Sequence, residues 1–307
     1  MRLFRMLAAA GLAAVIAGPA MAQERISIGT GGTGGLFYVI GAGMAEVLNK
    51  KMEGATARAE VTGASVENIR RVAADQMTFG FSSSSTLYEA SVGEGPFEEA
   101  LPVAAMAYLY PAVLQVATTA DSGIESMSDL AGKRINLGPP GSNSAVLAQR
   151  LLEAYDVFDA GNAQFLSYTE GTNALMNGTV DATVVLAGAP TAALIDLAAQ
   201  RDMRLLPVEP DKVEGLLKEF PFYQLYDIKA GTYEGQDAAV TVINDPATIF
   251  TAKDADEGTI YNITKAIFDN LDTLAQVHPQ AAAIALETAP KTPIALHPGA
   301  KRYFDGH

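Results

Sequence analysis

The sequence predicts an α/β protein of two lobes hinged like a clamshell, each lobe a mixed sheet flanked by helices. Three observations predict this fold class. Several segments run in the order strand, glycine- or serine-rich loop, helix, and this order occurs in both halves of the chain. Two pairs of adjacent apolar strands meet at Tyr110-Pro111 and around Asp245-Pro246. Their spacing predicts two crossings between the lobes, with lobe 1 formed by 23–110 and 245–307 and lobe 2 by 111–244.

Residues 1–22 have the composition of an export signal. Arg2 and Arg5 form a basic start, Leu7–Ala17 is a short apolar core, and Ala20-Met-Ala22 fits a small-x-small cleavage site. The apolar core is too short to span a membrane. We therefore expect cleavage after Ala22 and a periplasmic protein.

Charge and residue usage exclude several classes of function. The chain of 307 residues has a net charge of −14, and loss of the signal's two arginines would make it −16. Such a surface argues against nucleic acid and anionic lipid as partners. Cysteine is absent and the three histidines, His278, His297 and His307, lie near the C-terminus without metal-ligand spacing. No cofactor and no metal site are expected.

The chain is organised around a glycine loop that follows its first predicted strand. Five glycines fall between Gly29 and Gly35, and Leu36–Asn49 then has an apolar face at helical spacing. A helix N-terminus after a glycine loop offers backbone N–H groups to an anion. Two other interpretations stay open: the loop formally matches the G-x-G-x-x-G dinucleotide fingerprint, although the acidic residue expected about 20 positions later is missing, or it only forms a tight turn.

Two more loops of the first half repeat this pattern. Thr62–Ser65 joins a strand to the helix Val66–Ala73, with Ser65 as its expected N-cap, and a serine run follows the strand Thr78–Phe81. In an open parallel sheet such loops lie along one edge, where ligands bind.

The second half of the chain repeats the order strand, glycine- or serine-rich loop, helix. Gly138–Ser144 follows the predicted strand Arg134–Leu137 and opens a helix, and Gly188–Pro190 follows the apolar strand Ala182–Leu186. A ligand would lie where both lobes present helix N-termini.

An enzyme is the weaker interpretation of these loops. Ser142 and Ser144 lack the G-x-S-x-G elbow, and no histidine precedes His278 to serve as a base. We therefore expect a binding protein, with a periplasmic enzyme or ligand sensor acting on a small anion in the same cleft as the alternative.

Short motifs spread over the whole mature chain resemble those of one family, the TAXI-subfamily solute-binding proteins of TRAP transporters. The matching segments are Gly29-Thr-Gly-Gly32 with Gly35, Tyr38, Gly41 and Asn49, then Thr62-Gly-Ala-Ser65-Val-Glu-Asn68, Phe79-Gly-Phe-Ser-Ser-Ser84, Pro140-Gly-Ser142, Gly188-Ala-Pro190 and His297-Pro-Gly-Ala300. Four departures lie in the expected pocket: Phe37, Val39-Ile40, Ala64 and Ser83 replace more polar or smaller residues of the family pattern.

The resemblance implies a type II periplasmic-binding-protein fold. It also implies capture of a small organic acid, of the dicarboxylate or acidic amino acid class such as glutamate or 2-oxoglutarate. The acid would pass to an ion-coupled TRAP membrane permease, commonly a single fused polypeptide in this subfamily. We expect the binding protein to act as a monomer.

The candidate ligand-binding residues come from all of these loops. A carboxylate would lie on backbone N–H groups between Gly32 and Gly35, with Ser65 and Asn68 beside it. Tyr38 and Tyr110 either line the cleft or are ordinary core packing residues, and both interpretations stay open. Arg70 and Arg71 are expected on a solvent-exposed helix face. The full set of predicted site residues is Gly32, Thr33, Gly34, Gly35, Tyr38, Ser65, Asn68, Ser83, Ser84, Tyr110, Ser142, Asn143, Ser144, Gly188 and Pro190.

Overall fold

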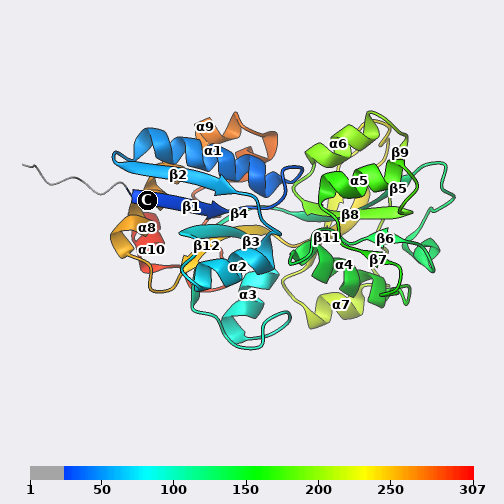
Figure 1. Ribbon diagram of the computed structural model, residues 1–307, viewed down its shortest axis with the longest axis horizontal. Coiled ribbons are helices and arrows are strands. Elements are labelled where there is room, and N and C mark those ends of the chain that lie inside the picture. The colour runs from blue at the N-terminus through cyan, green and yellow to red at the C-terminus, as the bar shows by residue number, and fades with distance from the viewer. Residues whose placement is uncertain (1–23) are drawn as a thin grey trace, which may run out of the picture.

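The computed structural model describes residues 24–307, and the expected signal segment lies outside these residues. Two sheets, each flanked by helices, lie side by side along the long axis of the molecule (Figure 1). The predicted fold class, a two-lobed α/β clamshell with mixed sheets, is confirmed by this arrangement.

The first sheet has the strand order β2-β1-β3-β12-β4. β1 pairs in parallel with β2 and β3, whereas β12 is antiparallel to β3 and β4. The strands are β1 (Glu24–Gly29), β2 (Ala55–Glu60), β3 (Phe79–Ser83), β4 (Val103–Tyr110) and β12 (Ala247–Ala252). The flanking helices are α1 (Leu36–Lys51), α2 (Ser65–Ala73), α3 (Ser84–Val92), α8 (Glu257–Phe268), α9 (Leu271–Ala275) and α10 (Pro298–Phe304).

The second sheet has the order β10-β11-β5-β8-β6-β7, with β9 paired to β5. Its strands are β5 (Val113–Thr119), β6 (Ile135–Asn136), β7 (Ala163–Gln164), β8 (Ala182–Ala187), β9 (Met203–Leu205), β10 (Gln224–Ile228) and β11 (Val240–Asn244). Its helices are α4 (Asn143–Ala154), α5 (Tyr168–Met176), α6 (Ala192–Ala198) and α7 (Glu214–Glu219). β10 and α7 had no counterpart among the predicted elements; β10 is an edge strand and mostly exposed, so its side chains lack a strong apolar pattern.

The chain passes between the sheets twice, from β4 to β5 and from β11 to β12. The two passages run next to each other, because the amide of Asp245 donates to the carbonyl of Ala112 at 2.8 Å. Both lie where the strand-Pro-strand patterns predicted the crossings. The lobe boundaries after Tyr110 and Asn244 remain a prediction.

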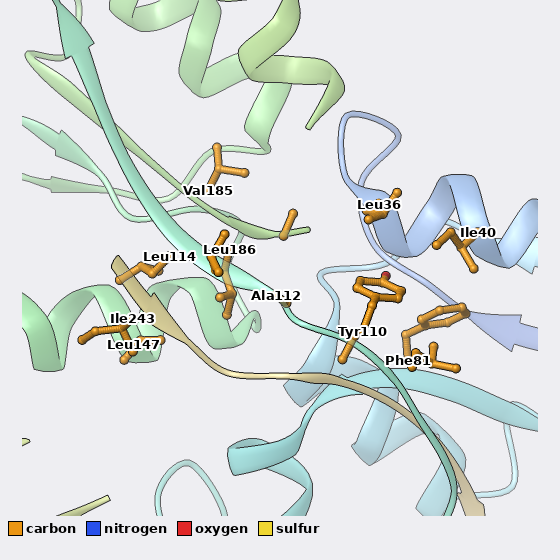
Figure 2. Close-up of a cluster of buried hydrophobic side chains, with 14 of the residues drawn as sticks. Leu36, Ile40, Phe81, Tyr110, Ala112, Leu114, Leu147, Val185, Leu186 and Ile243 are labelled. Atoms are coloured by element: carbon orange, nitrogen blue, oxygen red, sulfur yellow. The ribbon is translucent and has the colours of Figure 1, made fainter. Parts of the chain in front are cut away.

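One buried apolar cluster continues from the first sheet to the second. Figure 2 shows Ile40, Phe81 and Tyr110 on one side of the crossings and Leu114 and Ile243 on the other. The lobes are therefore packed against each other at the crossings. In residues 24–307 no helix is both long and apolar enough to cross a membrane.

Candidate ligand site

The candidate site is a pocket between the two sheets, where helices from both lobes begin. The first lobe contributes Gly31, Gly32, Gly35, Leu36, Phe37, Ala64, Ser65 and Ser83. The second lobe contributes Pro139, Ser142, Asn143, Ser144, Tyr168, Leu186 and Ala187. The pocket volume is about 20 Å³, room for one or two water molecules. The structure is therefore a closed form, and an organic molecule would enter with the lobes parted.

Buried hydrogen bonds hold the first lobe's loops in place under the pocket. The side chain of Asn68 is fully buried, donates to the carbonyls of Thr30 (2.7 Å) and Phe81 (2.9 Å), and accepts from the Thr62 hydroxyl at 2.7 Å. The amide of Ser83 donates to Ser65 Oγ at 3.0 Å, which leaves the Ser65 hydroxyl hydrogen to donate elsewhere. Asn68 thus joins the loops, and Ser65 faces the pocket.

The start of α2 is bound by the opposite lobe. The amides of Val66 and Glu67 both donate to the carbonyl of Gly141, at 3.0 and 3.1 Å. Ser65 is the first helical residue and not the N-cap that the sequence predicted; the N-cap is Ala64, at φ 76°. The orphan N–H groups of this helix are satisfied by a backbone carbonyl because the lobes are closed.

The start of α4 supplies the second lobe's polar groups. Ser142 is its N-cap: Oγ accepts from the amide of Ala145 at 3.3 Å and donates to the carbonyl of Pro139 at 2.6 Å. The hydroxyl of Ser144 donates to the carbonyl of Leu137 at 2.9 Å. Both serines line the pocket, but their hydroxyl hydrogens already have acceptors within the lobe.

The buried carboxylate of Asp245, at the passage from β11 to β12, accepts hydrogen bonds from both lobes. Asp245 is fully buried; its Oδ2 accepts from the side chain of Asn143 at 2.6 Å and from the Ser85 hydroxyl, and its Oδ1 accepts from the Ser85 amide at 3.1 Å. Burial raises the pKa of Asp245 to about 6, against the lowering effect of these hydrogen bonds. Because Ser85 belongs to α3 and Asn143 to α4, Asp245 connects the lobes when they are closed.

A second contact between lobes lies one helical turn further along α3. Arg150 of α4 places Nη2 2.8 Å from Glu89 Oε1, although the pair is not aligned as a hydrogen bond. Arg150 also donates to the Tyr223 hydroxyl at 2.7 Å, and its guanidinium lies 4.0 Å from the ring centre of Phe220. Burial raises the pKa of Glu89 and Arg150 opposes this. Separation of the lobes would expose this charge pair to water.

Several glycines of the loops face the other lobe, not the pocket. A Cβ on Gly34 would strike Thr169 Oγ1, one on Gly63 would strike the carbonyl oxygen of Pro140, and one on Gly188 would lie 2.6 Å from Leu36. In contrast, a Cβ on Gly32 would meet only Ser167 Cβ, at an ordinary 3.8 Å. Close approach of the two lobes therefore explains these glycines better than close approach of a ligand.

The predicted site residues divide into two groups. Seven line the pocket, namely Gly32, Gly35, Ser65, Ser83, Ser142, Asn143 and Ser144. The others do not line it in this closed form: Thr33, Gly34, Tyr38, Asn68, Ser84, Tyr110, Gly188 and Pro190. Ser84 bonds to Thr248 across the sheet at 2.8 Å. Tyr110 is fully buried in the core, with no hydrogen-bond partner for its hydroxyl among residues 24–307.

The two arginines nearest the loops in sequence both point to partners elsewhere. Arg70 donates to the carbonyl of Pro96 at 2.8 Å, and Arg71 pairs with Glu60 at 3.0 Å and Glu67 at 3.5 Å. Neither lines the pocket. Arg70 is exposed, as expected for a solvated face, whereas Arg71 is half-buried.

Sequence reasoning missed several apolar wall residues, although Phe37, a departure from the family motif, was expected in the pocket and does line it. Among the missed residues, Leu36 is the first residue of α1, and Leu186 and Ala187 end β8. Tyr168 opens α5, and its hydroxyl donates to the carbonyl of Leu186 at 2.9 Å. The signal that could have found them is the strand-loop-helix order itself, since each lies at a strand end or a helix start.

Comparison with known proteins agrees with this architecture. The model of the NMT1-like family matches residues 28–306, nearly the whole described chain. The chain belongs to the NMT1-like family. The TAXI-subfamily assignment is finer than this match and remains part of the proposal below.

Several solved structures are similar to this NMT1-like protein. The periplasmic binding protein BugD has a TM-score of 0.58 at 14% identity, over 92% of this chain and 95% of that chain. MatC from Rhodopseudomonas palustris with bound malate has 0.56 at 14%, over 92% and 97%. A putative L-cystine ABC transporter protein from Listeria monocytogenes has 0.53 at 13%, over 88% and 99%. At these identities the similarity shows the fold, which is that of the type II periplasmic binding proteins.

Proposed function

We propose that the protein is a periplasmic solute-binding protein that captures a small organic acid between its lobes and delivers it to a TRAP-type membrane permease. The observation that carries the proposal is the pocket between the lobes, which the first residues of α1 and α4 line from opposite lobes. A helix N-terminus offers backbone N–H groups to an anion. The fold and the NMT1-like family membership support a role in solute binding.

The chemistry of the pocket suits binding without turnover. Its polar side chains are serines, one asparagine and Tyr168, and none of the lining residues is a histidine, lysine, aspartate or glutamate. The Tyr168 hydroxyl donates to the carbonyl of Leu186 at 2.9 Å, and burial raises its pKa to about 12, so it is poorly suited to transfer protons. Binding would close the lobes on the acid and exclude water, and opening would release it to the permease. Export by residues 1–22, a monomeric state and a fused permease are further parts of the proposal, and they rest on the sequence motifs.

A thermal-shift screen of the mature protein against organic acids and amino acids tests this function. An acid present at about 100 times its Kd should add about 2.7 kcal/mol of stability if only the folded protein binds it. The same acids should be recovered chemically unchanged after long incubation. A stable protein that no acid in the screen stabilises, or conversion of an acid to product, would refute the proposal.

A further inference from the structure

The absence of charged side chains from the pocket lining limits which acids can bind there. This inference rests on the proposed function. None of the fifteen lining residues is a lysine, arginine, histidine, aspartate or glutamate. Positive charge for an acid must therefore come from helix N-termini, each equivalent to roughly half a unit charge.

Five helices begin at the cleft, and four of these N-termini have acceptors; at α4 the acceptor is the neutral hydroxyl of Ser142, which accepts from the amide of Ala145 at 3.3 Å. The α2 amides bind the carbonyl of Gly141, and the α3 amide of Ser85 binds the carboxylate of Asp245. α5 is closed by a capping box in which Ser167 and Glu170 bind each other's backbone N–H groups. A ligand carboxylate would have to displace these acceptors.

Among the described residues, the starts of α1 and α4 are bound neither by a carboxylate nor by a carbonyl of the opposite lobe, unlike those of α2, α3 and α5. Both helices are long, 16 and 12 residues, and neither has an acidic residue in its first turn. Leu36 and Phe37 of α1 and Asn143 and Ser144 of α4 line the pocket from opposite lobes. Two half charges balance roughly one carboxylate.

A second carboxylate would meet an unfavourable environment. The carboxyl of Asp245 lies directly behind the pocket, 2.6 Å from the side-chain nitrogen of Asn143, and its pKa of about 6 leaves it ionised at pH 7. A further buried negative charge would lose its hydration without gaining a cationic partner.

The other residues of the pocket lining indicate which groups the ligand carries besides its carboxylate. Asn143 is buried and its Oδ1 has no hydrogen-bond partner among residues 24–307, so a ligand group that donates a hydrogen bond would satisfy it. The walls near it are apolar: Leu36, Phe37, Leu186 and the ring of Tyr168. We propose that the ligand is a small monocarboxylic acid with an adjacent ammonium or hydroxyl group and a short apolar remainder, in place of the dicarboxylate that the motif resemblance implies.

Two matched pairs of probes test this inference by titration calorimetry on the mature protein at pH 7.5. L-lactate and L-malate share a 2-hydroxy acid, and L-alanine and L-aspartate share a 2-amino acid; within each pair one member has a second carboxylate. At least one monocarboxylate should bind about tenfold or more tightly than its partner, as expected for an unpaired buried charge. The pair that binds identifies the donor as hydroxyl or ammonium.

A substitution in the wall provides a second measurement. Phe37→Lys adds a cation to the lining, and Phe37→Met is its matched control without charge. The lysine variant should bind L-malate or L-aspartate about tenfold more tightly than the methionine variant does.

The two proposals fail in different ways. Tighter binding of the dicarboxylate in either pair overturns the monocarboxylate inference and leaves the proposed function standing. Absence of binding by all four probes also overturns the inference. The proposed function itself fails only if the wider acid screen gives no stabilisation.

Discussion

Substitution of Asp245 by asparagine should remove a pH-dependent part of the protein's stability. Burial raises the pKa of this carboxyl from 3.8 to about 6, so the folded protein binds the proton more tightly than the unfolded chain does. Between about pH 4 and pH 6 the native state therefore holds more protons than the unfolded state. The contribution of Asp245 to stability is greatest at low pH and falls as the pH rises through this window.

The size of the change in unfolding free energy follows from the difference between the pKa of Asp245 in the unfolded and folded states. About two pH units at about 1.4 kcal/mol each give about 3 kcal/mol between pH 4 and pH 7.5, roughly half of it by pH 5. Asparagine fits the same space, and an amide flip of Asn143 would offer its unpartnered Oδ1 to the new side-chain nitrogen. The variant should therefore fold.

Urea unfolding of both proteins at pH 4, 5, 6 and 7.5, at constant ionic strength, measures the effect. The difference in unfolding free energy, wild type minus Asp245→Asn, should decrease by about 3 kcal/mol over this range. Taking the difference cancels the titrating groups that do not interact with Asp245. Glu89 is an exception, because its charge contributes to the raised pKa of Asp245. Asp121→Asn, at an exposed loop position, controls for the loss of one carboxylate. A difference that stays constant or increases with pH would refute the argument.

Two further substitutions test contacts at the cleft, each measured with an acid that stabilises the protein in the screen. Gly34→Ala should weaken binding about tenfold and leave a larger radius of gyration at ligand saturation, because its Cβ would strike Thr169 on closure, whereas Gly32→Ala has room and should change affinity less than about threefold. Equal losses for both variants would show that the loop binds the ligand directly. Ser142→Ala should reduce the unfolding free energy by about 1 kcal/mol, as for a lost N-cap, and change affinity less than about threefold. Unchanged stability with a large loss of affinity would instead make Ser142 a ligand contact.

Local patterns in the sequence determined the architecture. Strand and helix periodicities, glycine and serine at the turns, and proline beside Tyr110 and Asp245 all act over a few residues, so they can be interpreted without knowing what packs against them. They predicted the two lobes, the crossings and the edge at which the pocket lies. Seven pocket residues, among them Ser65 and Asn143, follow from the same patterns because they stand at strand ends and helix starts.

The roles of individual residues were decided by the tertiary structure. Gly34 and Gly63 appear in the sequence as a flexible, anion-binding type of loop, but the atoms nearest to them belong to the other lobe. Whether the amides of α2 are free depends on the carbonyl of Gly141, 75 positions after Val66 by their residue numbers. The unusual pKa of Asp245 likewise arises from burial between lobes. Contacts between segments distant in the chain leave no periodic signal, so only the folded arrangement shows which polar groups remain for a ligand.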